Sequence, residues 1–388
     1  MAHSYIVHYG ELGLKGRNRI TFERILVSNI QRALEDLGRA EVRRSYSRIL
    51  VAAPDGIDAD ALEGRLRRIP GIAYFAPVTT TALSMDAICE TAVELSRGVI
   101  TPDTRFRVTT SRGNKQFPLT SPEVSREVGA RVVAATGAAV DLHTPEITLT
   151  VQIYDEEAHL FVRRIPGLGG LPYGSSGRVL ALFSGGIDSP VAAHLMMKRG
   201  CAVDFVHFHL LRSQQQIRES KIVAMAHALL EPHRAPGRLT MISAAPFESA
   251  MATLDSRVAT VVFRRFIMRA AEVVAGRRRI PALVTGESVG QVASQTLKNI
   301  HVIAQTTTLP ILRPLIGMDK EEIIEVAQAI GTFELSIQPY QDPCSLHAQR
   351  PSIWSRTEDV LAVEEKIDVN MLLKETLASH VEEIRITF

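Results

Sequence analysis

The chain has few of the residues and segments that define several common classes of protein. Its 388 residues include three cysteines, Cys89, Cys201 and Cys344, which are too few and too scattered for a disulfide framework or a Cys-x-x-Cys metal site. No apolar run approaches the length of a membrane span, and the N-terminal residues have no signal-peptide apolar segment. We therefore expect a cytoplasmic protein in a reducing environment, with no membrane contact.

Neither sign of charge is in large excess. The 44 Lys and Arg residues against 42 Asp and Glu residues give a net charge of +2, which by itself predicts no binding to nucleic acid. RNA contacts would have to come from local basic patches, of which RFRVTTSRGNKQF at 105–117 and FRRFIMRAAEVVAGRRR at 263–279 are the clearest. From charge alone, either patch is equally well interpreted as a solvated face of the protein.

Apolar residues are abundant enough, at 46%, to build full cores without disulfides. From about residue 178, continuous apolar segments such as VLALF (179–183) and AVDFVHFHL (202–210) alternate with helical patterns. This alternation predicts an α/β fold with a parallel, doubly wound sheet. The expected helices lie at 189–199, near 217–230, near 253–275, near 291–299 and at 319–330.

The part of the chain before residue 178 has a different organisation. Residues 1–60 show a strand–helix–strand order typical of a small α+β module, and residues 61–165 form a second α+β block that ends in a predicted hairpin, EITLTVQIYDEEAHLFVRR. Glycine and proline then punctuate residues 166–177, PGLGGLPYGSSG, which we interpret as a linker. The predicted domains are therefore 1–60, 61–165 and 178–388.

A glycine turn connects the first strand of the third block to its first helix, within VLALFSGGIDSPVAAHLMMKRG (179–200). Ser189 and Pro190 are typical of an N-cap and a first helical residue, so free N–H groups of the helix would face the turn. Glycines allow a ligand to approach the backbone, and together these features favour an anion site over a plain strand-to-helix turn. The turn lacks the lysine of a Walker A loop and the spacing of a G-x-G-x-x-G dinucleotide turn.

Helix and strand lengths indicate which residues share an edge of the sheet with this turn. His207, Phe208 and Gly286 end or follow strands at that edge, whereas the helix carries the chain about 16 Å away, to Cys201, at 1.5 Å per residue. Ligands of open α/β sheets bind at the carboxyl ends of the strands, so the first three residues are candidates and Cys201 is not. His207 and His209 have no evident third ligand, so we predict no metal site there.

The cysteines fall into two kinds. Cys201 and Cys89 lie in apolar surroundings and are expected to be buried, small hydrophobic residues. Cys344 lies in a polar, proline-marked loop with His347 and Arg350 nearby. A cysteine in such a loop is either a nucleophile with a lowered pKa or an incidental, partly exposed residue.

The Ser-Gly-Gly-x-Asp-Ser turn resembles the pyrophosphate loop of N-type ATP pyrophosphatases, and nearly the whole chain resembles the tRNA 4-thiouridine synthetase (tRNA uracil 4-sulfurtransferase) family. The resemblance implies an N-terminal ferredoxin-like domain, a THUMP domain and a PP-loop ATP pyrophosphatase domain. The matching stretches are GELGLKGRNR, FPLTSPEVSREVGA, GLGGLPYGSSG, LFSGGIDSPVA, VHFH, TGESVGQVASQTLKN, RPLIGMDKEEII and GTFELSIQPYQDPC.

This resemblance also implies the reaction and the site. ATP would adenylate O4 of a uridine near position eight of tRNA, and sulfur would then replace that oxygen as AMP leaves. The family's catalytic positions correspond to Asp188 and Cys344. The implied contacts to ATP, with Mg²⁺ alongside the pyrophosphate, are Leu182, Phe183, Ser184, Gly185, Gly186, Asp188, Ser189, His207, Phe208, Arg264, Gly286 and Gln295. The implied contacts to RNA are Arg105, Arg107, Arg112 and Lys115.

Two departures from the family pattern concern the supply of sulfur. The chain ends at Phe388, so we expect no C-terminal rhodanese-like domain, and Pro343 stands where many relatives have a second cysteine. The resemblance implies a cysteine desulfurase as donor, with the persulfide carried either on Cys344 or on a separate carrier protein. A monomer and a homodimer both stay open.

Three other functions are weighed against tRNA thiolation. The first is an adenylating enzyme with another substrate, but such an enzyme needs no RNA-binding block before its catalytic domain. The second is sulfur transfer to the thiamine thiazole precursor, which the absent rhodanese-like domain disfavours. The third is a non-catalytic RNA-binding protein, which the intact turn disfavours.

Overall fold

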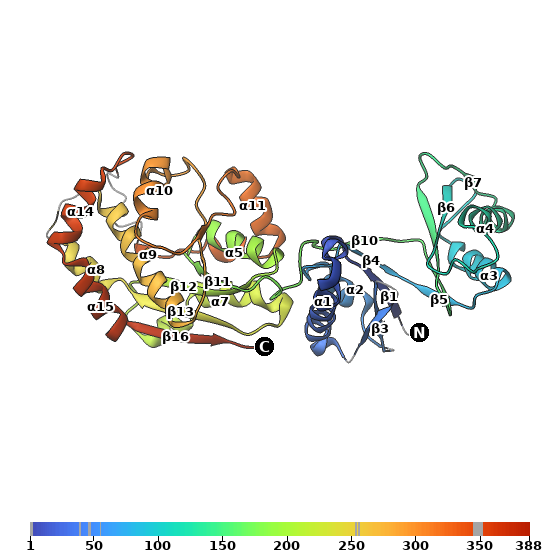
Figure 1. The fold of residues 1–388 in the computed structure, drawn as a ribbon, viewed down its shortest axis with the longest axis horizontal. Helices are drawn as coiled ribbons and strands as arrows, with labels where there is room; N and C mark the ends of the chain where they lie inside the picture. The colour runs from blue at the N-terminus through green and yellow to red at the C-terminus, as the bar shows by residue number, and fades with distance from the viewer. Residues whose placement is uncertain are drawn as a thin grey trace. The chain divides into compact units, whose positions relative to one another are not determined.

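The computed structural model describes residues 3–38, 40–45, 48–54, 56–252, 254, 257–343 and 352–388. It divides into two compact units, Met1–Pro172 and Tyr173–Phe388 (Figure 1). The division falls inside the segment interpreted as a linker. Within the described residues, no helix combines the length and the apolar character that crossing a membrane requires. Cys344, His347 and Arg350 lie outside the described residues.

The first sheet of unit 1 has the order β10-β4-β1-β3-β2 and is antiparallel. Helices α1 (Arg19–Ala33) and α2 (Ala59–Arg67) share a core with it through residues such as Leu26, Ile30, Leu62 and Leu66. The strands are β1 (His3–His8), β2 (Glu41–Ser45), β3 (Arg48–Ala53), β4 (Tyr74–Pro77) and β10 (Ile165–Pro166), and short 3-10 helices span Glu11–Leu14, Gly16–Asn18 and Glu35–Leu37.

This sheet corrects the predicted boundary at residue 60. The module extends beyond it because α2 and β4 bury Leu66, Ile72 and Phe75 in the same core as β1. The same sheet also includes β10, which pairs with β4 and contains Pro166, the first residue of the predicted linker. The predicted boundary therefore falls inside α2, a helix of this module.

The second sheet of unit 1 has the order β5-β9-β8-β6-β7. The predicted hairpin is present, since β8 and β9 pair antiparallel, and β6 pairs parallel with β8. Helices α3 (Met85–Ser96) and α4 (Ser121–Thr136) pack on this sheet, and Thr120 with Glu123 forms a capping box for α4. The strands are β5 (Thr79–Thr81), β6 (Arg105–Arg112), β7 (Ala139–Val140), β8 (Ile147–Ile153) and β9 (Ala158–Phe161).

Unit 2 contains the predicted doubly wound sheet, in the order β15-β14-β11-β12-β13-β16. All neighbours are parallel except β16, which pairs antiparallel with β13. The chain builds from β11 through β12 to β13 on one side and then places β14 and β15 on the other, so the order reverses between β11 and β14. The strands are β11 (Arg178–Leu182), β12 (Ala202–His209), β13 (Gly237–Ser243), β14 (Leu283–Val284), β15 (Ile311–Leu312) and β16 (Val381–Ile386).

Helices cover both faces of this sheet (Figure 1). Val179 and Ala181 of β11 point into one core and Leu180 into the other, as the period of two residues in a strand requires. On the first face lie α5 (Asp188–Lys198), α7 (Lys221–Leu230) and α11 (Lys320–Ala329). On the second lie α9 (Ala259–Arg277), α10 (Leu297–Ala304), α14 (Thr357–Lys366) and α15 (Val369–Ser379).

The predicted helices differ from the structure in three places. The segment near 217–230 is two helices, α6 (Gln214–Arg218) and α7, separated at Ser220. The segment near 253–275 is replaced by α8 (Ala245–Met251) and α9. The segment near 291–299 contains a 3-10 turn, and the α-helix α10 begins only at Leu297 and continues to Ala304. The remaining short helices are α12 (Phe333–Ser336) and two 3-10 turns, Glu231–His233 and Ala293–Gln295.

Candidate active site

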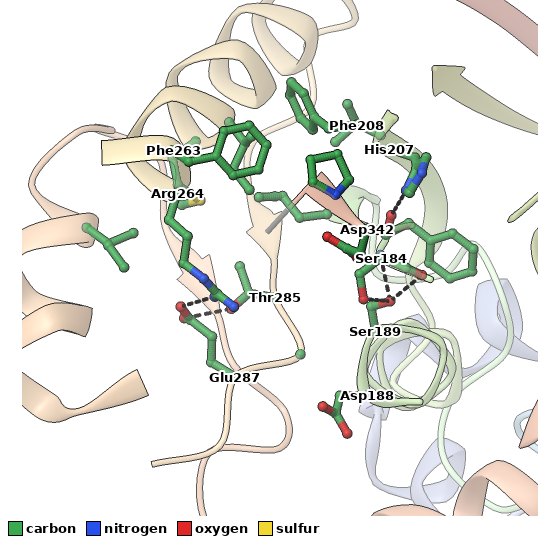
Figure 2. Close-up of a pocket in the computed structure, with 18 of the residues that line it drawn as sticks. Ser184, Asp188, Ser189, His207, Phe208, Phe263, Arg264, Thr285, Glu287 and Asp342 are labelled. Carbon is green, nitrogen blue, oxygen red and sulfur yellow. Dashed lines mark hydrogen bonds and ion pairs between the residues drawn. The ribbon is translucent and has the colours of Figure 1, made fainter. Parts of the chain in front are cut away.

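A pocket opens at the carboxyl ends of β11, β12 and β14, beside the point where the strand order reverses (Figure 2). Among the predicted nucleotide contacts, those that line it are Leu182, Phe183, Ser184, Asp188, Ser189, His207, Phe208, Arg264, Gly286 and Gln295. Gly185 and Gly186 belong to the same turn but are not among the lining residues. The other lining residues are Val206, Phe263, Ile267, Met268, Thr285, Glu287, Ile303, Asp342 and Pro343.

The two serines of the turn hold it closed. The Ser189 hydroxyl accepts from the Ser184 backbone N–H at 2.8 Å, and it lies 3.1 Å from the Ser184 hydroxyl. Helix α5 therefore begins at Asp188, with Ile187 at the N-cap position. The prediction that Ser189 caps the helix is wrong, because its hydroxyl is engaged by the turn behind it. The first N–H groups of α5 lack partners within the helix and lie beside the pocket.

Gly286 permits a close approach of backbone to backbone. A Cβ atom at this residue would lie 2.8 Å from the Ser189 nitrogen and 2.9 Å from the Asp188 carbonyl carbon. Backbone atoms at the start of α5 cannot yield as a flexible side chain would. The glycine therefore lets the end of β14 reach the first turn of α5.

Asp188 occupies the first turn of α5 with both carboxylate oxygens engaged. One oxygen forms an ion pair with Lys320, the first residue of α11, and the other accepts from the Gln291 side-chain amide at 2.9 Å. These contacts join the starts of α5 and α11 to the loop after β14. Sequence reasoning missed both partners, although each lies in a stretch used for the family resemblance.

The buried Glu287 carboxylate lies beside Arg264 on the opposite side of the pocket from Asp188 (Figure 2), and it also binds Arg313. Glu287 accepts from Arg264 Nη1 at 3.3 Å, from Arg313 Nε at 2.7 Å and from the Thr285 hydroxyl at 3.0 Å. Three donors around one carboxylate fix the guanidinium groups in orientation. Sequence reasoning singled out Arg264 but missed Glu287 and Arg313, whose roles depend on this pairing.

His207 connects the turn to a distant segment of the chain. Its Nδ1 lies 2.6 Å from the Phe183 carbonyl oxygen and its Nε2 lies 2.7 Å from the Tyr340 hydroxyl. A carbonyl oxygen only accepts, so Nδ1 carries the hydrogen and Nε2 accepts from Tyr340. Burial lowers the pKa of His207 to about 4, so the ring is neutral at physiological pH. Burial also raises the pKa of Tyr340, which keeps its hydroxyl a donor.

Lys221 fixes the same distant segment. Its ammonium group donates to the carbonyl oxygens of Ser336 and Gln338, each at 2.7 Å, and lies near the Tyr340 ring. Burial lowers the pKa of Lys221, and the negative charge of Asp342 opposes that shift. The chain that leads to Asp342 and Pro343, both of which line the pocket, is thereby held against β12 and the turn.

Apolar side chains form another part of the lining. Phe208 and Phe263 meet edge to face with ring centroids 6.4 Å apart, and Ile267, Met268 and Ile303 continue this surface. The pocket therefore combines an apolar wall with the N-terminus of α5 and an oriented guanidinium. Such a combination suits a ligand with a flat ring system and anionic groups.

The remaining predicted residues lie elsewhere. Cys89 and Cys201 are buried, as expected, and burial raises the pKa of each thiol. His209 accepts from the Leu211 backbone N–H at 3.1 Å. Among the described residues, His, Cys, Asp and Glu form no group of three or more that could hold a metal ion.

The predicted RNA contacts lie on and after β6 in unit 1. Arg105 is exposed but forms ion pairs with Glu146 and Asp141. Arg107 Nε donates to the Thr148 hydroxyl at 3.2 Å. Arg112 donates to two backbone carbonyl oxygens, those of Phe117 and Leu119, and Lys115 is exposed.

Three family models match consecutive parts of the chain. The thiamine biosynthesis protein (ThiI) model matches residues 174–369, the ThiI ferredoxin-like domain matches residues 4–76 and the THUMP domain matches residues 82–163.

Relatives match the chain over nearly its whole length. A probable tRNA sulfurtransferase of Moorella thermoacetica is 40% identical, covering 100% of this chain and 97% of that protein. A probable tRNA sulfurtransferase of Caldanaerobacter subterraneus is 41% identical, covering 94% of this chain and 95% of that protein. Among solved structures, a 4-thiouridine synthetase in complex with RNA and ATP superposes with a TM-score of 0.87 at 31% identity, covering all of both chains.

Proposed function

The chain belongs to the thiamine biosynthesis protein (ThiI) family, and on this premise we propose that it is an ATP-dependent tRNA sulfurtransferase that converts a uridine near position eight of tRNA to 4-thiouridine. The observation that carries the proposal is the full-length similarity to a 4-thiouridine synthetase with bound RNA and ATP, combined with a pocket of suitable chemistry. The related tRNA sulfurtransferases support tRNA as the substrate, and the pocket supports ATP as the co-substrate.

The pocket suggests how ATP would lie. The adenine ring would pack on Phe208, Phe263 and their apolar neighbours, and the phosphates would extend toward the first turn of α5. Helix N-termini stabilise phosphate groups through unpaired N–H donors and the helix dipole. Arg264, oriented by Glu287, would face the phosphates from the other side.

The residues present are compatible with a Mg²⁺ ion that accompanies ATP. Asp188 and Asp342 both line the pocket, and Mg²⁺ usually takes one or two protein carboxylates together with substrate phosphates. These two carboxylates would hold the ion, which would neutralise phosphate charge when bound. Glu287 is a weaker candidate, because it pairs with two arginines, whereas Asp188 pairs with one cation, Lys320.

The proposed reaction has two stages. O4 of the uridine attacks the α-phosphorus of ATP, and pyrophosphate leaves while Arg264 and the α5 N–H groups stabilise the developing charge. The outer sulfur of a persulfide on Cys344, supplied by a cysteine desulfurase, then attacks C4 and AMP leaves. A further thiol then attacks the sulfur atom of Cys344, which breaks its bond to the sulfur now on C4 and forms a disulfide between that thiol and Cys344.

The two structural units suggest a division of labour. We infer that residues 1–172 hold the tRNA and residues 173–388 carry the chemistry, with the THUMP match at 82–163 supporting the first assignment. Lys115 and Arg105 are the exposed candidates for phosphate contacts. Arg112 contributes to the fold of its own loop through two carbonyl contacts and is a weaker candidate.

Deletion of the gene tests the proposal in the cell. We expect 4-thiouridine to be absent from total tRNA of the deletion strain, as measured by mass spectrometry of nucleosides, and to return with the wild-type gene. Normal amounts of 4-thiouridine in the deletion strain would refute the proposal.

Gly286→Ala tests the placement of ATP. The added Cβ must displace the backbone of Asp188 and Ser189, which begins the helix that would hold the phosphates. Overpacking of this kind costs about 1–3 kcal/mol. If that cost falls on the bound geometry of the turn, ATP should bind about 5- to 150-fold more weakly. The measurement is the dissociation constant of ATP by calorimetry. Gly317→Ala is the matched control, because its Cβ would meet no atom within 4 Å. Equal ATP affinity in both variants would exclude this site.

A further inference from the structure

A large aromatic side chain is exposed on the surface of unit 2. Trp354 is the one tryptophan of the chain, and it is 65% exposed, whereas aromatic side chains of this size usually bury most of their surface. The Lys298 ammonium group lies over its ring. Leu297 and Ile353 beside it are also exposed. No part of the proposed mechanism uses these residues.

The segment that carries Trp354 is fixed in place by hydrogen bonds. The Thr296 hydroxyl donates to the Ile353 carbonyl oxygen at 2.9 Å, and the buried Asn299 side chain donates to the Ser352 carbonyl oxygen at 2.9 Å. Asn299 also accepts from the Ser355 backbone N–H at 3.0 Å. The exposed ring is therefore presented by an ordered frame, which lowers the entropy lost when a ligand binds.

This surface lies next to the proposed ATP pocket. Gln295 and Ile303, just before and within α10, line the pocket, while Leu297, Lys298 and His301 line the shallow surface around Trp354. Helix α10 has eight residues and is about 12 Å long at 1.5 Å per residue. A polymer that delivers one unit to the pocket therefore has neighbouring units within reach of Trp354.

The chemistry of the surface favours nucleic acid. Lys298, His301 and Arg356 surround the ring, and Glu358 is the one acidic residue that lines this surface among the described residues. An exposed aromatic face combined with cations is the arrangement by which proteins bind unstacked nucleotides. A purely apolar patch would instead have favoured a protein partner.

We propose that Trp354 and Lys298 form a stacking platform for an unstacked nucleotide of the substrate tRNA, close in the RNA to the uridine that reacts. This inference rests on the proposed function, because the uridine must leave its stack to reach ATP. When the uridine leaves its stack, the base next to it loses a stacking partner, and the Trp354 ring takes that place. Lys298 contacts the phosphate that adjoins this base. The platform thereby stabilises the open form of the RNA.

Intrinsic fluorescence of the full wild-type chain tests the platform directly, because all tryptophan emission comes from Trp354. Addition of unmodified tRNA should quench the emission, since a stacked base quenches an indole ring, whereas ATP alone should not. Binding of tRNA is verified separately by filter retention. Saturating tRNA that binds but leaves the emission unchanged would overturn the proposal.

Substitutions at Trp354 measure its contribution. Trp354→Ala should weaken tRNA binding about 5- to 150-fold, as expected for the loss of one stacked base, and leave the affinity for ATP unchanged. Trp354→Phe should retain most of the affinity. Met371→Ala, an exposed apolar residue of α15, is the matched control and should bind tRNA normally.

The same variants separate failure of the inference from failure of the proposed function. If wild-type protein forms no 4-thiouridine with tRNA, ATP and a sulfur donor, the proposed function fails. If wild-type protein is active and Trp354→Ala binds tRNA normally, the platform is excluded. A Trp354→Ala protein that binds tRNA normally but needs more cysteine desulfurase for the same rate would assign this surface to the donor protein, which also overturns the proposal.

Discussion

An Asp188→Ala protein is expected to lose tRNA-dependent release of pyrophosphate from ATP by at least about 10²-fold, a loss typical of removing one preorganised electrostatic contact. Asp188 lies in the first turn of α5, beside the proposed phosphate position, and binds both Lys320 and Gln291. Its removal leaves the Lys320 ammonium group without this carboxylate and releases the contact between α5 and α11. Pyrophosphate release with ATP and unmodified tRNA is the measurement.

The control for this substitution lies on the same helix. Lys198→Ala changes a charged residue in the last turn of α5, at the end away from the pocket, and should leave the rate within about twofold of wild type. Circular dichroism shows whether both variants fold. A folded Asp188→Ala protein that releases pyrophosphate at the wild-type rate would exclude the turn as the phosphate site.

A Cys344→Ser protein is expected to form no detectable 4-thiouridine while still releasing pyrophosphate in the presence of tRNA. A serine hydroxyl cannot carry a persulfide, so the second stage stops, whereas the first stage needs no thiol. Cys344 lies outside the described residues, but Asp342 and Pro343, which precede it directly in the sequence, line the pocket. Their position supports delivery of sulfur at the pocket rather than elsewhere.

The two other cysteines provide matched controls. Cys89→Ala and Cys201→Ala remove buried thiols whose pKa is raised by burial, so neither thiol is a reactive thiolate. Both variants should form 4-thiouridine at close to the wild-type rate if they fold. Wild-type thiolation by Cys344→Ser, with a cysteine desulfurase as the sulfur source, would show that this cysteine carries no sulfur.

Local patterns in the sequence predicted much of the catalytic unit. Continuous apolar strands and the glycine turn indicated β11, α5 and β12 in the right order. The rule that ligands bind at the carboxyl ends of strands placed His207, Phe208 and Gly286 at one edge of the sheet, where all three line the pocket. These predictions succeeded because they depend on nearby residues and on the lengths of single elements.

Contacts between distant segments could not be predicted in the same way. The bond between His207 and Tyr340 joins residues 133 positions apart, and the pair Asp188–Lys320 spans 132 positions. Strand β15, which precedes α11, has two residues and no sequence signal of its own. Without that strand, Lys320 could not be placed at the same edge as Asp188.

The charged strand β16 escaped prediction for a related reason. Apolar and polar residues alternate only partly in its sequence VEEIRI, so the pattern does not indicate that Ile384 and Ile386 face the core. Charged residues on an edge strand prevent further pairing of the sheet, so this composition is a property of edges rather than of loops. The pairing of β16 with β13 depends on tertiary contact and not on local preference.

The products formed from ATP distinguish adenylation of tRNA from every other use of this pocket. Purified protein is incubated with unmodified tRNA, ATP, cysteine and a cysteine desulfurase, and nucleotides and tRNA nucleosides are quantified together. We predict that AMP, pyrophosphate and 4-thiouridine form in equal amounts and that omission of tRNA abolishes release of pyrophosphate. Formation of ADP and phosphate, or of 4-thiouridine without cleavage of ATP, would contradict the assignment of this pocket to adenylation of tRNA.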